Sequence, residues 1–258
     1  MSFKIPVMAS LFRKFPIQNL GNFIKRNIKT ACHKKQTKNY LIVRPTVDDY
    51  EQILCLMRRA YYPEEPTCCS LAFKPTVVFD DITIQSLSEG YSLIAKCKYN
   101  GDILGACINE TSHCWDPDIK DSLACKVSDV KSRQLLHFYA YMQRVPDLWR
   151  KYGVQKIFEL CYMFVRKDQR GKGIAYDLTL KSRLLAADCG FPLVRIDATS
   201  YYTAKLCEKM KLKLVEEIPY CTYVGADQRP IFRPPDPHKS VKIYVDDEPQ
   251  KNALLLKK

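Results

Sequence analysis

The 258-residue sequence predicts a three-layer mixed α/β domain, in which helices flank a central mixed sheet. Two observations support this fold class. β-branched and aromatic runs, which are typical of strands, alternate along the chain with segments of helical periodicity. The segment 156–188 has the pattern of a buried strand, a glycine loop and a helix in succession. A hydrophobic content of 47% is enough for the core of one such domain.

The first half of the chain is expected to begin the sheet and to cover it with two helices. Thr46 is a suitable N-cap for the first helix, and Asn100-Gly101 is a strong signal for a β-hairpin. The expected elements are a strand over 40–44, a helix after Thr46, a loop over 61–66, a helix over 80–87, and strands over 91–99 and 102–109.

The second half is expected to complete the sheet. Residues 111–127 are polar and irregular, which predicts a flexible loop, and Gly190 is a plausible C-cap for the helix of the central segment. The remaining expected elements are helices over 130–143 and 201–211, and a helix after the glycine loop that has an apolar stripe over 178–185 and ends at Cys189-Gly190. Strands are expected over 157–165, 193–197, 212–224 and 241–245, and a proline-rich loop over 230–237.

The net charge of +13 is concentrated at the start of the chain. Residues 1–39 hold nine Lys and Arg residues and no acid, so the rest of the chain carries only about +4. This distribution argues against a nucleic-acid-binding function for the folded part. Residues 1–39 are therefore expected to be a basic extension, and their composition also fits a mitochondrial presequence. The expected location is intracellular, either cytoplasmic or, if the presequence interpretation holds, mitochondrial.

Twelve cysteines occur without a C-x-x-C motif and with irregular spacing, which favours free thiols in a reducing compartment. The four histidines have no metal-ligand spacing, so no metal site is expected. No segment reaches the roughly 18 consecutive apolar residues that span a bilayer, so we expect no membrane span. A monomer is expected.

The glycine loop has the chemistry of an anion site. Two glycines allow the backbone to approach a ligand closely, and the loop opens a helix whose N-terminus carries partial positive charge. Its R-x-x-G-x-A pattern at Arg170, Gly173 and Ala175, preceded by the strand residue Val165, resembles the acetyl-coenzyme A loop of the GNAT acetyltransferase superfamily.

Three further stretches, MRRAYYPEEPTCCSLAF, ATSYYTAKLCEKM and IFRPPDPHKSVKIYV, are similar in order and type to motifs of insect-type arylalkylamine (dopamine-like) N-acetyltransferases. The resemblance implies a GNAT-type three-layer fold over residues 40–258, with a mixed, mostly antiparallel sheet. It also implies acetyl transfer from acetyl-CoA to a primary amine, most simply an arylalkylamine, within a ternary complex.

The resemblance assigns the catalytic residues. Glu65, which directly precedes the proline of the E-P motif, would be the general base, because an ammonium must lose a proton before it can attack a thioester. Thr199 and Thr203 stand where the family commonly carries serine hydroxyls that handle protons. Cys207 occupies the position of the usual tyrosine acid, and either Cys207 or the nearby Tyr202 is a candidate to replace it.

The resemblance also implies a coenzyme site and an amine pocket. The exposed backbone at Met163, Phe164 and Val165 would pair with the pantetheine arm, and the glycine loop would hold the pyrophosphate through Arg170, Gly171, Lys172, Gly173, Ile174 and Ala175. Tyr61, Tyr62 and Phe73 are candidates to line an arylalkylamine pocket, and each is equally a candidate for the core.

Two other functions are compatible with the sequence. One is a GNAT enzyme for a different acceptor, such as a polyamine or a protein amino group. The other is a non-catalytic acyl-CoA-binding module, which the missing tyrosine and the threonine replacements would favour.

Overall fold

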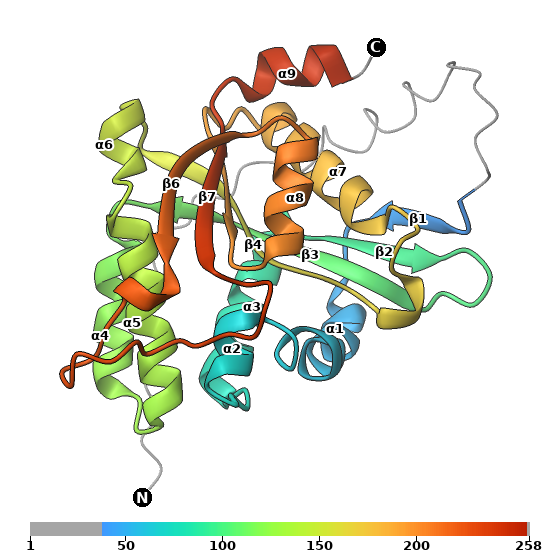
Figure 1. Ribbon diagram of the computed structural model, residues 1–258. Coiled ribbons are helices and arrows are strands. Elements are labelled where there is room, and N and C mark those ends of the chain that lie inside the picture. Colours follow the sequence, from blue (N-terminus) through green and yellow to red (C-terminus); the bar gives the residue numbers. More distant parts are fainter. Residues whose placement is uncertain (1–37, 257–258) are drawn as a thin grey trace, which may run out of the picture. The chain divides into compact units, whose positions relative to one another are not determined.

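The computed structural model describes residues 38–256, which form one seven-stranded sheet with helices on both faces (Figure 1). The predicted extension over 1–39 therefore lies outside the described residues, except for its last two positions. The three-layer α/β fold class is confirmed.

The sheet is mixed and mostly antiparallel, as expected. Its strands lie in the order β1-β2-β3-β4-β5-β7-β6, and β4 and β5 are its parallel pair. The strands are β1 (Tyr40–Val43), β2 (Leu93–Cys97), β3 (Ile103–His113), β4 (Lys156–Val165), β5 (Val194–Ala198), β6 (Lys213–Pro219) and β7 (Ser240–Asp246).

The helices divide between two hydrophobic cores, one on each face of the sheet. The first core lies under α1 (Tyr50–Leu56), the π-helical turn Met57–Tyr61, α2 (Pro66–Ser70), α3 (Val77–Ser88), α4 (Asp116–Lys126), α5 (Val130–Arg144) and α6 (Leu148–Tyr152). The second lies under α7 (Ile174–Asp188) and α8 (Tyr201–Lys209). The last helix, α9 (Pro249–Leu256), packs against α7 (Figure 1).

The prediction of a flexible loop over 111–127 was wrong. β3 continues to His113, and α4 follows with Pro117 in its first turn. The Asp116 carboxylate accepts a hydrogen bond from the His113 backbone N–H at 2.7 Å and so fixes the entry to the helix. The polar face of α4 is stabilised by ion pairs between Arg144 of α5 and two aspartates, Asp118 and Asp121. Only Pro117 and Ala124 of this helix are buried, which is why its sequence shows no apolar stripe.

Smaller differences concern single elements. The strand expected over 212–224 stops at Pro219 and is followed by a 3-10 turn, Tyr220–Thr222. Helices α2, α6 and α9 were not expected. Gly190 follows α7 with a φ of +73°, as the C-cap prediction requires.

Gly105 brings β3 close to the part of β4 on which the coenzyme prediction rests. A Cβ at this position would lie 2.7 Å from the Phe164 carbonyl oxygen, which is backbone and has no room to move. We expect Gly105→Ala to cost about 1–3 kcal/mol of unfolding free energy, measured by urea denaturation. Gly225→Ala is the control, because the nearest atom to its Cβ would be the side-chain oxygen of Asp227 at 3.2 Å, and its other two neighbours would lie at ordinary contact distances of 3.7 and 3.9 Å. Equal stability of the two variants would contradict this account of the β3–β4 contact.

Candidate active site

A cleft opens where β4 and β5 separate. Their parallel pairing runs from Phe158–Val194 to Leu160–Ile196 and ends there. The cleft is lined by Tyr61, Leu160, Cys161, Met163, Ile196, Asp197, Thr199 and Thr203. Four residues proposed from the sequence, Tyr61, Met163, Thr199 and Thr203, therefore lie together although they are distant in the chain.

A β-bulge shapes one wall of this cleft. In the antiparallel β3–β4 pair, Ile108 lies opposite Tyr162 and Asn109 lies opposite Leu160, so Cys161 is an additional residue in β4. Burial and the nearby Glu110 and Glu159 carboxylates hold the pKa of the Cys161 thiol well above its ordinary value. This thiol stays protonated near neutral pH and is a poor nucleophile.

The glycine loop has the conformation that its sequence predicts. Gly171 and Gly173 have φ values of +75° and +81°, a region that L side chains rarely adopt. A Cβ at either position would meet no heavy atom within 4 Å, so the space beside the loop is open. Helix α7 begins directly after Gly173, and its N-terminus therefore faces the loop.

The basic side chains of the loop already have partners. Arg170 donates from Nε to the Val165 carbonyl at 3.1 Å, and its Nη2 lies 2.6 Å from a carboxylate oxygen of Glu64. The Glu64–Arg170 ion pair links the E-P motif to the glycine loop, a contact that no local sequence pattern predicts. Lys172 donates to the side-chain oxygen of Gln169 at 2.9 Å.

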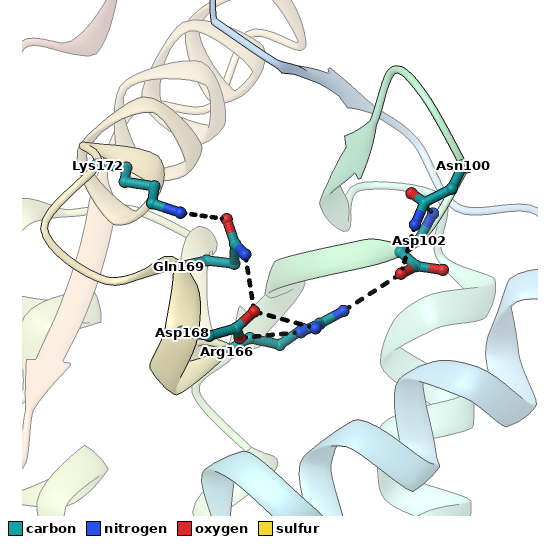
Figure 2. Close-up of polar contacts among 6 residues, drawn as sticks. All are labelled: Asn100, Asp102, Arg166, Asp168, Gln169 and Lys172. Atoms are coloured by element: carbon teal, nitrogen blue, oxygen red, sulfur yellow. Dashed lines mark hydrogen bonds and ion pairs between the residues drawn. The ribbon is translucent and has the colours of Figure 1, made fainter.

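A polar network holds the loop against the β2–β3 turn (Figure 2). Arg166, which follows β4, donates to both carboxylate oxygens of Asp168 and lies 3.5 Å from Asp102 of the hairpin. Gln169 donates to Asp168, and Asn100 donates to Asp102, both at 2.8 Å. From the sequence, Asn100 was identified only as part of the hairpin turn. The contact between Arg166 and Asp102 joins positions too far apart for a local pattern to show.

Glu65 is the N-cap of α2 and is almost completely buried, with 5% of its surface exposed. Its Oε2 accepts hydrogen bonds from the Cys68 backbone N–H at 2.7 Å and from the Thr67 hydroxyl. Its other oxygen, Oε1, is buried and has no hydrogen-bond partner within residues 38–256. A carboxylate oxygen in this situation can accept a proton or a hydrogen bond from a bound molecule.

Glu65 lies close to the cleft, beside Tyr61. The pKa of the Tyr61 hydroxyl is raised well above its ordinary value. Burial is the main cause, and the negative charge of Glu65 is the second. Burial is also the main cause that raises the pKa of Tyr139 and of Tyr220, and the Glu65 carboxylate adds to it. Glu65 is thus surrounded by phenols that stay neutral.

The other two aromatic candidates lie in the core instead of the cleft. Tyr62 and Phe73 are 2% and 6% exposed, and both rings pack edge-on against Phe79. Of the three residues proposed for an aromatic pocket, Tyr61 alone appears among the residues that line the cleft.

The opposite wall of the cleft is polar. Ser200 caps α8 by accepting a hydrogen bond from the Thr203 backbone N–H at 3.0 Å, and its hydroxyl lies 2.8 Å from that of Thr203. The Thr199 carbonyl accepts a hydrogen bond from the Tyr220 hydroxyl at 2.7 Å. Burial raises the pKa of the Asp197 carboxyl, although the buried Arg195 donates to both of its oxygens at 2.8 and 2.7 Å.

The two candidates for a general acid differ in their surroundings. Cys207 is fully buried in the core under α8, and burial raises its pKa to about 12. Tyr202 is 68% exposed, and its ring packs edge-on against His238. Cys207 therefore has the surroundings of a packed core thiol, whereas the exposed Tyr202 side chain is accessible to a ligand.

Within residues 38–256, no group of three or more His, Cys, Asp or Glu side chains is placed to hold a metal ion. In the same part of the chain, no helix combines the length and the apolar character needed to cross a bilayer.

Comparison with known proteins supports the fold. No protein-family model matches the chain. A mosquito arylalkylamine N-acetyltransferase-like 5b superposes with a TM-score of 0.76 over 80% of this chain and 99% of that one, at 23% sequence identity. An agmatine N-acetyltransferase gives 0.76 and a Drosophila melanogaster polyamine N-acetyltransferase gives 0.74, each at 23% identity over 81% of this chain and 99% of the other. The chain therefore has the fold of these N-acetyltransferases.

Proposed function

We propose that the protein transfers an acetyl group from acetyl-CoA to a primary amine. The observation that carries this proposal is the position of Glu65, whose unpartnered, buried carboxylate oxygen lies behind the cleft where β4 and β5 separate. The open glycine loop at the N-terminus of α7 follows the same strand, β4. A carboxylate behind the cleft and an anion site after the same strand suit a thioester with a phosphate-bearing tail.

The coenzyme would lie along β4. The backbone of Met163, Phe164 and Val165 extends beyond the last β4–β5 pair, so on the β5 side its polar groups can pair with the amides of the pantetheine arm. The amides of the glycine loop and the first turn of α7, with Arg170 and Lys172 beside them, would hold the pyrophosphate. A backbone N–H near Met163 would then polarise the thioester carbonyl.

The chemical step is a direct transfer. Glu65 takes a proton from the ammonium, either directly or through a water molecule, and the neutral amine attacks the carbonyl carbon. The carbon–sulfur bond breaks, and the attacking nitrogen gives up its second proton to solvent. The coenzyme thiolate leaves and is protonated by solvent or by the nearby Tyr202 hydroxyl. The protonated state of Cys161 agrees with a reaction that needs no covalent enzyme intermediate.

An arylalkylamine is the acceptor that the cleft suits best. The Tyr61 ring lines the cleft and is held by edge-on contacts with Tyr62 and Tyr162, at centroid distances of 5.3 and 5.4 Å. A fixed aromatic face favours a second aromatic ring. Release of the coenzyme thiol, measured in parallel with tryptamine, dopamine and spermidine, tests this choice. Preferential turnover of spermidine would replace the arylalkylamine with a polyamine acceptor.

The rival function, an acyl-CoA-binding module without catalysis, makes a different prediction for the same protein. It requires binding of acetyl-CoA in a calorimeter together with no amine-dependent thiol release for any amine in the panel. We expect amine-dependent release, because Glu65 keeps an unpartnered oxygen beside the cleft.

A substitution at Gly173 tests whether the glycine loop binds the coenzyme. We expect Gly173→Ala to weaken acetyl-CoA binding by about tenfold or more, because alanine costs roughly 1–2 kcal/mol in the left-handed conformation of this position. Gly190→Ala is the matched control, because Gly190 lies at the other end of the same helix with a similar φ and equally open space. Both variants should lose similar stability, but only the first should lose affinity in titration calorimetry. Equal affinities would place the coenzyme elsewhere.

The basic extension over 1–39 stays a separate proposal, either as a mitochondrial presequence or as a basic segment without a targeting function. A reporter fused to residues 1–39 distinguishes them, since only a presequence would carry the reporter into mitochondria.

A further inference from the structure

The inner end of the cleft is closed by two aliphatic side chains. Leu160 and Ile196 form the last residue pair of the parallel β4–β5 ladder, and beyond them the two strands are no longer paired. Both residues line the cleft, yet only 6% and 4% of their surfaces are exposed. They belong to the core under α7 and α8, so the end of the cleft is backed by packed side chains.

The adjoining wall is also fixed in place. The Thr179 hydroxyl lies 3.3 Å from the Met163 sulfur and 2.9 Å from the Ala175 carbonyl oxygen, so its single proton is shared between these two acceptors. Methionine is usually an adaptable side chain, but this contact with α7 restricts it. The remaining walls are formed by Tyr61, Cys161, Asp197, Thr199 and Thr203. The aliphatic side chains of the cleft, with the thioether of Met163, are therefore those of Leu160 and Ile196.

The closed end of the cleft limits the length of the acyl group that the coenzyme can carry. This inference rests on the proposed function. A coenzyme arm that runs along residues 163–165 brings its thioester to the point where the strands separate. The acyl chain beyond the carbonyl then points at the closed end of the cleft. We propose that Leu160 and Ile196 restrict the enzyme to the acetyl group, by filling the space that each further methylene of a longer acyl chain would need.

The expected discrimination between acetyl-CoA and longer acyl-CoAs is large, because the core behind Leu160 and Ile196 is close-packed. One additional methylene in a fitted hydrophobic pocket changes the rate by roughly 10- to 200-fold. Butyryl-CoA, which carries two more methylenes, should therefore be used at least about 100-fold less efficiently than acetyl-CoA. Shortening either side chain should reduce this ratio.

The test measures kcat/KM for acetyl-, butyryl- and hexanoyl-CoA with one saturating amine. Leu160→Ala and Ile196→Ala should each lower the acetyl-to-butyryl ratio by about tenfold or more, with a gain in the absolute rate on butyryl-CoA. Leu160→Val and Ile196→Val remove less volume, and they carry the test if the alanine variants do not fold. Ile157→Ala is the matched control, because Ile157 is a buried residue of β4 that belongs to the other core.

The outcomes separate this inference from the proposed function. If the unmodified protein turns over none of the acyl-CoAs with any amine, the proposed function fails. If it turns over acetyl-CoA but uses butyryl-CoA equally well, Leu160 and Ile196 do not restrict the acyl chain. An unchanged ratio in all four folded variants at these positions, or an equal change in Ile157→Ala, would likewise overturn the inference.

Discussion

Replacing Glu65 with glutamine is expected to lower kcat by about 10²- to 10⁴-fold while acetyl-CoA still binds. Glutamine has the shape of glutamate but cannot take the proton that an ammonium must lose. The measurement is steady-state thiol release at saturating amine, combined with titration calorimetry for the coenzyme. Turnover that is unchanged at saturating amine would remove Glu65 from the mechanism.

The structure explains why this substitution should leave the fold intact. Glu65 caps α2 by accepting hydrogen bonds through Oε2, and the glutamine side-chain carbonyl can accept the same bonds from Cys68 N–H and the Thr67 hydroxyl. Glu65→Ala, in contrast, would also lose the cap, at a cost of about 1 kcal/mol. Glu51→Gln is a suitable control, because Glu51 is an exposed acid on the nearby helix α1 and should have no effect on kcat.

The largest effect on stability is expected at Asp246, where Asp246→Ala should cost about 3–5 kcal/mol of unfolding free energy. This buried carboxylate joins three elements. It accepts two hydrogen bonds from Arg183 of α7, at 2.8 and 2.6 Å, and one from Asn252 of α9, at 2.6 Å. Asp246 and Arg183 are 3% and 5% exposed. Removal of the carboxylate leaves a buried guanidinium without its counter-charge, which is why the expected cost is high.

The neighbouring Asp247 provides the control for this prediction. Its carboxylate pairs with Lys213 at 2.6 Å, but the two side chains are 29% and 57% exposed. Asp247→Ala should therefore cost less than about 1 kcal/mol. Urea denaturation of both variants measures the difference. Similar midpoints for the two variants would show that the Arg183–Asp246 contact adds little to stability.

The sequence predicted the fold where local signals were strong. The apolar run of β4, the two glycines and the leucine-rich helix α7 are contiguous, so residues 156–188 could be interpreted directly. Asn100-Gly101 likewise defined the β2–β3 hairpin, and Gly101 has the positive φ that such a turn requires. Helix α4 was missed because it buries few residues and is stabilised by ion pairs with α5, which no local pattern shows.

The site was predictable in part for the same reason. Motifs pointed to Glu65, Thr199, Thr203 and the glycine loop, because each lies in a characteristic short stretch. The cap made by Glu65, the Glu64–Arg170 ion pair and the bulge at Cys161 depend on chain segments that meet only in the folded protein. Leu160 and Ile196 look like ordinary core residues in the sequence. Only the fold shows that they end the β4–β5 pairing and line the cleft.

Transfer of a labelled acetyl group tests the central claim most directly. The full-length protein is mixed with acetyl-CoA that carries an isotopically labelled acetyl group and with a primary amine, and both the amine and the intact protein are analysed by mass spectrometry. We predict that the label appears on the amine, that the coenzyme thiol is released in equal amount, and that no labelled protein accumulates. Binding of acetyl-CoA without a labelled amine, or label held on the protein itself, would contradict direct transfer with Glu65 as the general base.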